Sequence, residues 1–312
     1  MAIIDRNMTF SRGWLAVRED LDRSSVDTRE PSFLSSQVTS ARRYYLGVPD
    51  RTTQEIFVVC GGVERCRADY MIERSDLPYW VVEFVVEGAG ELTLDNRTHP
   101  LMPGVAFAYR PRTPHRIRTS EQAPMLKYFV TLLGHSMDEQ IRSTPLADLG
   151  VVRVSAIDEI VEIYEMLYRT ARKHTSFSAR LAAALVPVLL LKIAETAVPP
   201  GSADSVAFST YLRMRQLMLE RFREFRSLAE VAAAGGLKSS YLCRLFQRYD
   251  NQSAYQLLIR LKMSHAASLL LDQRRPVKDV AAQLGYADPF QFSKLFRKVH
   301  GLSPARFQRE TH

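Results

Sequence analysis

The sequence predicts a multidomain protein of mixed α and β structure, with a β-barrel and following helices at the N-terminus and an all-α domain at the C-terminus. Three observations support this fold class. Strand-like runs separated by turn residues fill positions 56–133, a helix-turn-helix pattern occurs twice after position 226, and an excess of basic residues is confined to the C-terminal third. A chain of 312 residues is also longer than one ordinary domain.

The strand signals lie between Ile56 and Leu133. Runs such as IFVVC and YWVVEFVVEG are rich in β-branched and aromatic residues, and turn pairs such as Asp95-Asn96 and Pro103-Gly104 separate them. Short, closely spaced strands of this kind favour a small antiparallel barrel or sandwich. We therefore assign residues 1–150 to a β-domain.

Helical periodicity follows the strands, and residues 151–195 are expected to form a helical segment. One stripe recurs at three- and four-residue steps and comprises Ile157, Ile160, Val161, Tyr164, Leu167 and Tyr168. Such a stripe packs on the barrel or also forms a dimer interface, and we predict dimerisation through this segment. The apolar run from Leu181 is interpreted as a buried helix. Residues 196–206, rich in Pro, Gly and Ser, are then a linker.

The C-terminal domain, residues 207–312, contains an internal repeat. VAAAGGLKSSYLCRLFQRY from Val231 aligns with VAAQLGYADPFQFSKLFRKV from Val280, at an offset of 49 residues before the turn and 50 after it. Each copy (about 227–249 and 277–299) contains a small-residue helix that reaches Gly236 or Gly285, where a turn with positive φ is expected. Ser239 and Asp288 are the candidate caps of the helix that follows. This order is that of a helix-turn-helix motif.

The second helix of each copy has one apolar and one polar face. Helical geometry predicts burial of Leu242, Leu245, Phe246 and Tyr249 in the first copy and of Phe292, Leu295, Phe296 and Val299 in the second. The opposite faces carry Ser240, Arg244, Gln247 and Arg248, and Phe290, Gln291, Lys294, Arg297 and Lys298, a set rich in donors for base edges and phosphates. A long helix, Ser253 to Gln273, joins the copies and spans about 30 Å, close to the roughly 34 Å between successive major-groove faces of DNA.

Charge is distributed unevenly along the chain. Residues 207–312 hold 18 Lys and Arg against 8 Asp and Glu, a net charge of +10, whereas the rest of the chain has a net charge of −2. A basic domain attached to a nearly neutral one is expected when one domain binds a polyanion. Together with the tandem motif, this asymmetry predicts binding to double-stranded DNA.

Residues 207–310 resemble the DNA-binding domain of the AraC/XylS family of bacterial transcription regulators. The resemblance rests on GYADPFQFSKLFRKVHGLSPARFQRE and on the earlier SSYLCRLFQRY. It implies sequence-specific binding to promoter DNA, a homodimer, and RNA polymerase as a partner if the protein is an activator. It also implies base-reading positions at Ser240, Cys243 and Arg244 in the first motif and at Phe290, Gln291 and Lys294 in the second.

The segment from Pro78 to His115 resembles the cupin-type effector domain common in that family. Enzymatic cupins hold a metal through the pattern H-x-H-x3-E-x6-G and a later histidine. Aligned on Glu83, the two histidine positions hold Leu77 and Tyr79, so only Glu83 and His115 match. We therefore expect no metal, no cofactor and no catalysis. A metal-dependent cupin enzyme with an appended helical domain is the alternative, and no P-loop, G-x-S-x-G or H-E-x-x-H motif suggests another enzyme.

The predicted barrel contains polar and aromatic residues that could converge on a small-molecule effector. They are Glu64, Tyr70, Arg74, Tyr79, Glu83, Tyr109 and His115. Arg74 suits a ligand carboxylate or phosphate, although a surface pair with Glu73 or Asp76 explains it equally well. Cys60 and Cys66 either bind a soft metal or sense oxidants, or are buried structural thiols.

The N-terminal sequence MAIIDRNMTFSRGW lacks the pattern of a signal peptide, and no apolar run is long enough to span a membrane. Three cysteines without a pairing framework suit a reducing compartment. We expect a cytoplasmic, nucleoid-associated bacterial regulator in which an N-terminal effector domain controls promoter binding. Control by a partner protein without a small ligand is the remaining alternative.

Overall fold

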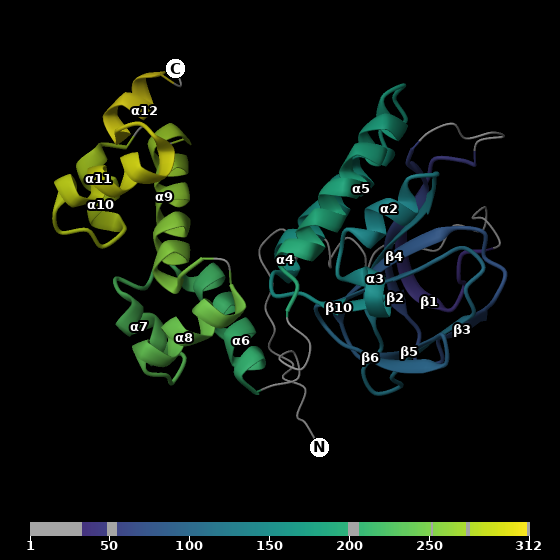
Figure 1. Cartoon of the computed structure of the whole chain (residues 1–312). Helices are drawn as coiled ribbons and strands as arrows, with labels where there is room; N and C mark the ends of the chain where they lie inside the picture. Colours follow the sequence, from purple (N-terminus) through teal and green to yellow (C-terminus); the bar gives the residue numbers. More distant parts are fainter. Residues whose placement is uncertain (1–32, 49–54, 199–205, 251, 273–274, 311–312) are drawn as a thin grey trace. The chain divides into compact units, whose positions relative to one another are not determined.

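The computed structural model describes residues 33–48, 55–198, 206–250, 252–272 and 275–310. They form two compact units that divide between residues 198 and 206 (Figure 1), and each unit is described by itself. Residues 1–32 of the expected β-domain and most of the expected linker at 196–206 lie outside the described residues.

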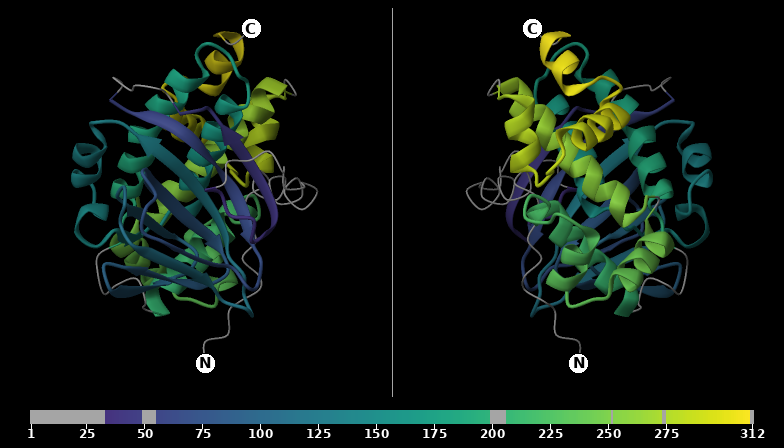
Figure 2. Two further views of the ribbon diagram at one scale, coloured as in Figure 1. Left: turned by 90° about the vertical axis from the view of Figure 1, so that its right-hand side faces the viewer. Right: turned by 90° about the vertical axis from the view of Figure 1, so that its left-hand side faces the viewer.

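The N-terminal unit is built on two antiparallel sheets. The larger has the strand order β1-β2-β9-β4-β7-β10, and the smaller has the order β3-β8-β5-β6; the purple strand β1 lies at the edge of the larger sheet (Figure 2). The strands are β1 (Val38–Tyr45), β2 (Phe57–Cys66), β3 (Met71–Arg74), β4 (Trp80–Glu87), β5 (Gly90–Leu94), β6 (Arg97–Leu101), β7 (Val105–Tyr109), β8 (His115–Thr119), β9 (Leu126–Leu133) and β10 (Val151–Arg153).

The burial pattern of each strand follows its sequence. WVVEFVVE of β4 is a nearly continuous apolar run and is buried along almost its whole length. HRIRT of β8 alternates instead, and its two arginines point outward while Ile117 packs inside. The core between the sheets contains Val85, Leu92, Leu101 and Ile117. Alternation therefore identifies the half-exposed sheet, whereas continuous apolar runs identify strands covered on both faces.

The helices of this unit among the described residues are α2 (Met137–Arg142) and α3 (Leu146–Leu149), which precede β10, and α4 (Ile157–Ala171) and α5 (Ser178–Glu195), which follow it. The predicted stripe on α4 packs on the larger sheet, where Tyr164 donates a hydrogen bond to the carbonyl oxygen of Val82 at 3.1 Å. Burial of α5 is only partial, because Leu181 and Leu191 are 54% and 64% exposed. The expectation of a fully buried α5 is thus wrong, since only one face of this helix packs on its neighbours.

The C-terminal unit is helical, as predicted. It comprises α6 (Val206–Arg221), α7 (Leu228–Ala234), α8 (Ser239–Tyr249), α9 (Ala254–Asp272), α10 (Val277–Gln283), α11 (Pro289–His300) and α12 (Pro304–Glu310). The long helix α9 runs between the α7–α8 pair and the α10–α11 pair (Figure 1). Among the described residues no helix is both long and apolar enough to cross a membrane.

The two motifs are more alike in structure than their aligned segments suggest. Arg213 of α6 donates to the carbonyl oxygen of Gly235 at 3.1 Å, and Lys262 of α9 donates to that of Leu284 at 2.8 Å. The two donors, Arg213 and Lys262, lie 49 residues apart in the sequence, and so do the two acceptors, Gly235 and Leu284. A carbonyl at the C-terminus of a helix lacks an intrahelical donor, so each cation satisfies an orphan acceptor just before the turn. The repeat therefore includes the preceding helix, α6 or α9.

The turns confirm one expectation and correct another. Gly236 and Gly285 have φ of +70° and +83°, as predicted. Asp288 caps α11 by accepting a hydrogen bond from the backbone N–H of Phe290 at 2.9 Å. The predicted cap Ser239 is instead the first helical residue of α8, and Lys238 occupies the N-cap. The first turn is one residue shorter than the second, which is why the repeat offset changes from 49 to 50.

The buried face of α8 is as predicted, but that of α11 differs. Phe292 and Phe296 are fully buried, whereas Leu295 is half-buried and Val299 is 38% exposed. His300 and Phe307 pack against Phe296, with ring centroids 4.4 and 5.4 Å away. These two rings fill the core at this end of α11, where the helical pattern placed Val299. The predicted burial of Val299 is therefore wrong.

Candidate DNA interface and effector site

The exposed faces of α8 and α11 carry all ten residues predicted to contact DNA. On α8 these are Ser240, Cys243, Arg244, Gln247 and Arg248; on α11 they are Phe290, Gln291, Lys294, Arg297 and Lys298. Each set lies opposite the buried residues of its own helix, because helical geometry separates the two faces. The structure thus brings the predicted residues together on one surface per helix.

Three cations of these faces are available to an anionic partner. Within the described part of the chain, Arg244, Lys294 and Lys298 form no ion pair with a carboxylate. The guanidinium of Arg244 lies over the ring of Tyr241, 5.6 Å from its centroid, which limits the directions in which it points. Unpaired, exposed arginine and lysine side chains suit contacts with phosphates and base edges.

The predicted effector residues converge inside the barrel. Glu64, Tyr70, Arg74, Glu83 and Tyr109 line one cavity of about 30 Å³. The ring of His115 stacks on Tyr109 with a centroid distance of 3.9 Å, and Tyr79 packs against Phe33 at 5.3 Å. This volume is far below the roughly 300–1,000 Å³ of most small-molecule pockets.

The sequence reasoning missed the residue at the centre of this interior. Lys127 of β9 is buried and donates to Glu83 Oε2 at 2.7 Å and to Glu64 Oε2 at 3.1 Å. Tyr109 donates to the other oxygen of Glu83 at 2.8 Å, and Arg43 donates to the other oxygen of Glu64 at 2.9 Å. The signal was present, because a single lysine interrupts the apolar strand LKYFVTLL.

Electrostatics favour the charged forms of Lys127 and Glu64. Burial opposes the charge of Lys127, but Glu64 and Glu83 outweigh it and raise the pKa of Lys127 well above its ordinary value. Burial alone would raise the pKa of Glu64; Lys127 and Arg43 outweigh that effect and lower it. The buried ammonium and its two carboxylates therefore act as one unit.

The donors of this interior do not fit a metal ion. Both oxygens of Glu83 already accept hydrogen bonds from Lys127 and Tyr109, so the ammonium supplies the cation that a metal would otherwise provide. His115 Nδ1 lies 2.8 Å from the carbonyl oxygen of Thr113, which leaves Nε2 buried with no hydrogen-bond partner in the described structure. Burial lowers the pKa of His115. No group of three or more potential ligands occurs among the described residues.

Two further predicted features have simple structural explanations. Cys60 and Cys66 are buried, and burial raises the pKa of the Cys66 thiol to about 12, which makes it unreactive near neutral pH. Among the described residues Arg74 forms no ion pair with Glu73 or Asp76, the partners that the sequence offered, and Glu73 pairs with Arg116 at 2.9 Å.

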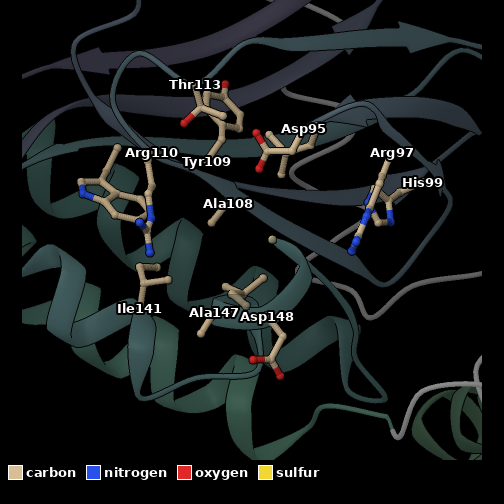
Figure 3. Close-up of a pocket in the computed structure, with 14 residues that line it drawn as sticks. Asp95, Arg97, His99, Ala108, Tyr109, Arg110, Thr113, Ile141, Ala147 and Asp148 are labelled. Carbon is tan, nitrogen blue, oxygen red and sulfur yellow. The ribbon is translucent and has the colours of Figure 1, made fainter.

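A second, larger cavity lies outside the network. This outer cleft has a volume of about 450 Å³ and lies among strands β4–β7 and helices α2 and α3 (Figure 3). Its lining includes the buried side chains of Trp80, Leu94, Ala108, Tyr109, Ile141 and Leu146, with Asp95, Arg97, His99, Arg110 and Asp148 around them. Sequence patterns did not reveal it, because its residues come from separate strands, a turn and two short helices.

Comparison with known proteins is consistent with both units. A family model described as a helix-turn-helix domain matches residues 231–310, and one described as a cupin domain matches residues 81–131. The Msm operon regulatory protein of Streptococcus mutans is 20% identical over 252 residues, which cover 80% of this chain and 91% of that protein. The MmsAB operon regulatory protein of Pseudomonas aeruginosa is 23% identical over 82% of this chain and 83% of its own length.

Among solved structures, the C-terminal domain of AraT, a response regulator from Geobacillus stearothermophilus, is 30% identical. The match covers 34% of this chain and 88% of that domain, with a TM-score of 0.31. The two domain models and the operon regulators agree with the resemblance of the sequence to AraC/XylS transcription regulators.

The protein is a DNA-binding transcriptional regulator with a cupin domain ahead of its helix-turn-helix domain. Three relatives that match 80% or more of the chain are named as operon regulators. In this protein an internal lysine, Lys127, occupies the middle of the polar interior of the cupin barrel.

Lys127→Met should destabilise the N-terminal unit by about 3–5 kcal/mol at neutral pH, because Glu83 is then left buried without its cation. The wild-type protein should lose stability as the pH falls below about 4.5, because the unfolded chain then binds a proton at Glu64 that the folded protein, with its lowered Glu64 pKa, does not bind. In Lys127→Met this acid-dependent loss should be smaller, since Lys127 is a main cause of the lowered pKa of Glu64, so the defect should shrink at low pH. Urea unfolding followed by circular dichroism between pH 3 and 8 measures both trends.

Lys192→Met is the matched control. Lys192 pairs with Glu159 at 3.1 Å on the helical surface of the same unit, and such pairs contribute about 1 kcal/mol or less. Equal destabilisation by the two substitutions, or a Lys127→Met defect independent of pH, contradicts the proposed role of the buried network.

Proposed function

We propose that this protein binds paired promoter sites as a homodimer, that each chain reads two successive major grooves through α8 and α11, and that a small molecule in the cupin domain controls this binding. The observation that supports it most directly is the pair of exposed, basic helix faces at opposite ends of α9. RNA polymerase is a further partner if the protein is an activator. Because promoter DNA is its target, we place it in the bacterial cytoplasm with the nucleoid.

The geometry of the C-terminal unit supports reading of adjacent grooves. Helix α9 has 19 residues, which at 1.5 Å per residue corresponds to about 28 Å. Successive major-groove faces on one side of B-DNA are about 34 Å apart. A separation of this order allows α8 and α11 to enter neighbouring grooves of one duplex.

Arg244→Ala and Lys298→Ala should weaken DNA binding in different ways. Arg244 is proposed to read guanine, so Arg244→Ala should cost about 1–3 kcal/mol of binding free energy on a selected site and little on random DNA. Lys298 is proposed to contact phosphate, so Lys298→Ala should weaken binding to both DNAs equally and reduce the slope of log K against log salt by about 1. Fluorescence anisotropy on selected and random duplexes at several salt concentrations measures this. An equal loss on both DNAs for Arg244→Ala rules out its base-reading role.

An apolar seam on α5 supports the homodimer. Phe177, Leu181, Val188 and Leu191 are between 47% and 64% exposed, and with exposed Ala184 they recur at steps of four, three, four and three residues. This is the spacing of positions a and d in a coiled coil, where two helices bury a shared seam. The stripe on α4 packs on the sheet, so we now propose α5 rather than α4 as the dimer helix.

Leu181→Glu with Leu191→Glu should convert the protein to a monomer, because both carboxylates would be buried at the seam. Light scattering coupled to size-exclusion chromatography measures the mass, and binding to a two-site duplex should fall while binding to a single site is retained. Arg180→Glu, an exposed residue beside the seam, is the control and should stay dimeric. A double variant that remains dimeric contradicts the α5 seam.

The effector is best accommodated by the outer cleft. The seven predicted effector residues remain candidate contacts, but the cavity that five of them line has a volume of only about 30 Å³. Binding pockets for small molecules usually have about 300–1,000 Å³, a range that includes the outer cleft. Tyr109 lines both cavities and donates to Glu83, so it links a ligand in the cleft to the buried network. Such a ligand regulates DNA binding if it favours one arrangement of the protein.

A panel of monosaccharides, amino acids and short carboxylic acids, screened by thermal shift, should contain a compound that raises the melting temperature. Stabilisation approaches about 2.7 kcal/mol at one hundred times Kd. Arg97→Ala should abolish this shift because Arg97 lines the cleft; Arg118→Ala should not, because this exposed arginine pairs with Glu91 elsewhere on the same sheet. Equal effects of the two substitutions exclude the cleft, and the absence of any compound that shifts the melting temperature favours control by a partner protein.

A further inference from the structure

We propose that α11 reads A·T base pairs and that Phe290 contacts the 5-methyl group of a thymine in the major groove. This inference rests on the proposed DNA-reading role of α11. It adds the chemical identity of the base and makes Phe290 a residue that determines specificity.

The ring of Phe290 is held where a base edge can reach it. Its side chain is 86% exposed, and its backbone N–H is fixed by the cap at Asp288. Pro289 occupies the first turn of the helix, where its fixed φ favours helical geometry. Phe292 and Phe296 fill the core on the opposite face, so the ring of Phe290 has no place in the interior.

The chemistry of the major groove selects the partner of such a ring. Thymine alone among the four bases presents an apolar group there, the C5-methyl, and apolar side chains contact it. A phenyl ring has no donor or acceptor, so against any other base it would cover polar groups without replacing their hydrogen bonds to water. The ring therefore favours thymine both by contact and by exclusion of the alternatives.

The neighbours of Phe290 agree with an A·T site. Gln291 is exposed beside it, and glutamine pairs in bidentate fashion with adenine N6 and N7. The residue of α8 that aligns with Phe290 is Ser240, and the reading face of α8 carries Arg244, which suits guanine. The two faces thus differ in chemistry, and each chain reads a site with a defined direction, one end containing G·C and the other A·T.

The test begins with selection of binding sites from random duplexes by the full-length wild-type protein. Thymines in the selected site are then replaced one at a time by deoxyuridine, which differs only in the missing methyl group. At one thymine the replacement should lower wild-type affinity about 4-fold, the effect of burying one methyl group. Phe290→Ala should bind the thymine site more weakly and no longer distinguish thymine from deoxyuridine at that position.

Two control variants keep the result specific. Gln291→Ala should lose preference for adenine but keep the deoxyuridine effect, and Phe290→Leu, which retains an apolar side chain, should keep part of it. Since Phe290 is exposed, Phe290→Ala should keep the wild-type circular dichroism spectrum and melting temperature, which separates loss of contact from loss of fold.

The proposal is overturned if no deoxyuridine replacement affects wild-type binding, if Phe290→Ala keeps the full methyl effect, or if Phe290→Ala binds as tightly as wild type. The last result would indicate that the ring contacts a protein partner instead of DNA. If the wild-type protein selects no sequence at all, the proposed function itself fails, which is distinguishable from each of these outcomes.

Discussion

A hydrogen bond from a cation to the carbonyl before each turn is the interaction on which both α8 and α11 depend. Arg213 makes it in the first motif and Lys262 in the second, each from the long helix that precedes the motif. It ties the end of the small-residue helix to its neighbour just where Gly236 or Gly285 reverses the chain. The direction of α8 and α11 follows from that junction, because α8 begins three residues after Gly236 and α11 begins four residues after Gly285.

Aromatic packing then fixes the face that each reading helix presents. Phe246 packs against Tyr211 of α6 with ring centroids 5.2 Å apart, and Phe296 packs among Phe292, His300 and Phe307. A helix anchored along one side by fully buried rings cannot rotate without opening a cavity. The polar side is therefore presented to solvent in one orientation, which suits the proposed contacts with base edges.

The cupin domain, by contrast, has charged side chains buried inside its barrel. Glu83 lies where enzymatic cupins place a metal-binding glutamate, and here Lys127 and Tyr109 satisfy both of its oxygens. A buried ion pair of this kind needs all its partners, since one charge alone in the interior is costly. The interior is consequently almost filled, and the space suited to a ligand lies in the outer cleft, which shares the wall formed by Tyr109.

Local patterns in the sequence were enough to predict the tandem motif, the glycines with positive φ, the cap at Asp288 and the exposed positions of α8 and α11. These features depend on the spacing of residues along one helix or turn. The partner of Glu83, the exposure of Val299, the lining of the outer cleft and the seam on α5 depend on which segments meet in space. Lys127 lies 44 residues from Glu83, and spacing along a chain says nothing about a contact that only the pairing of β4 with β9 creates.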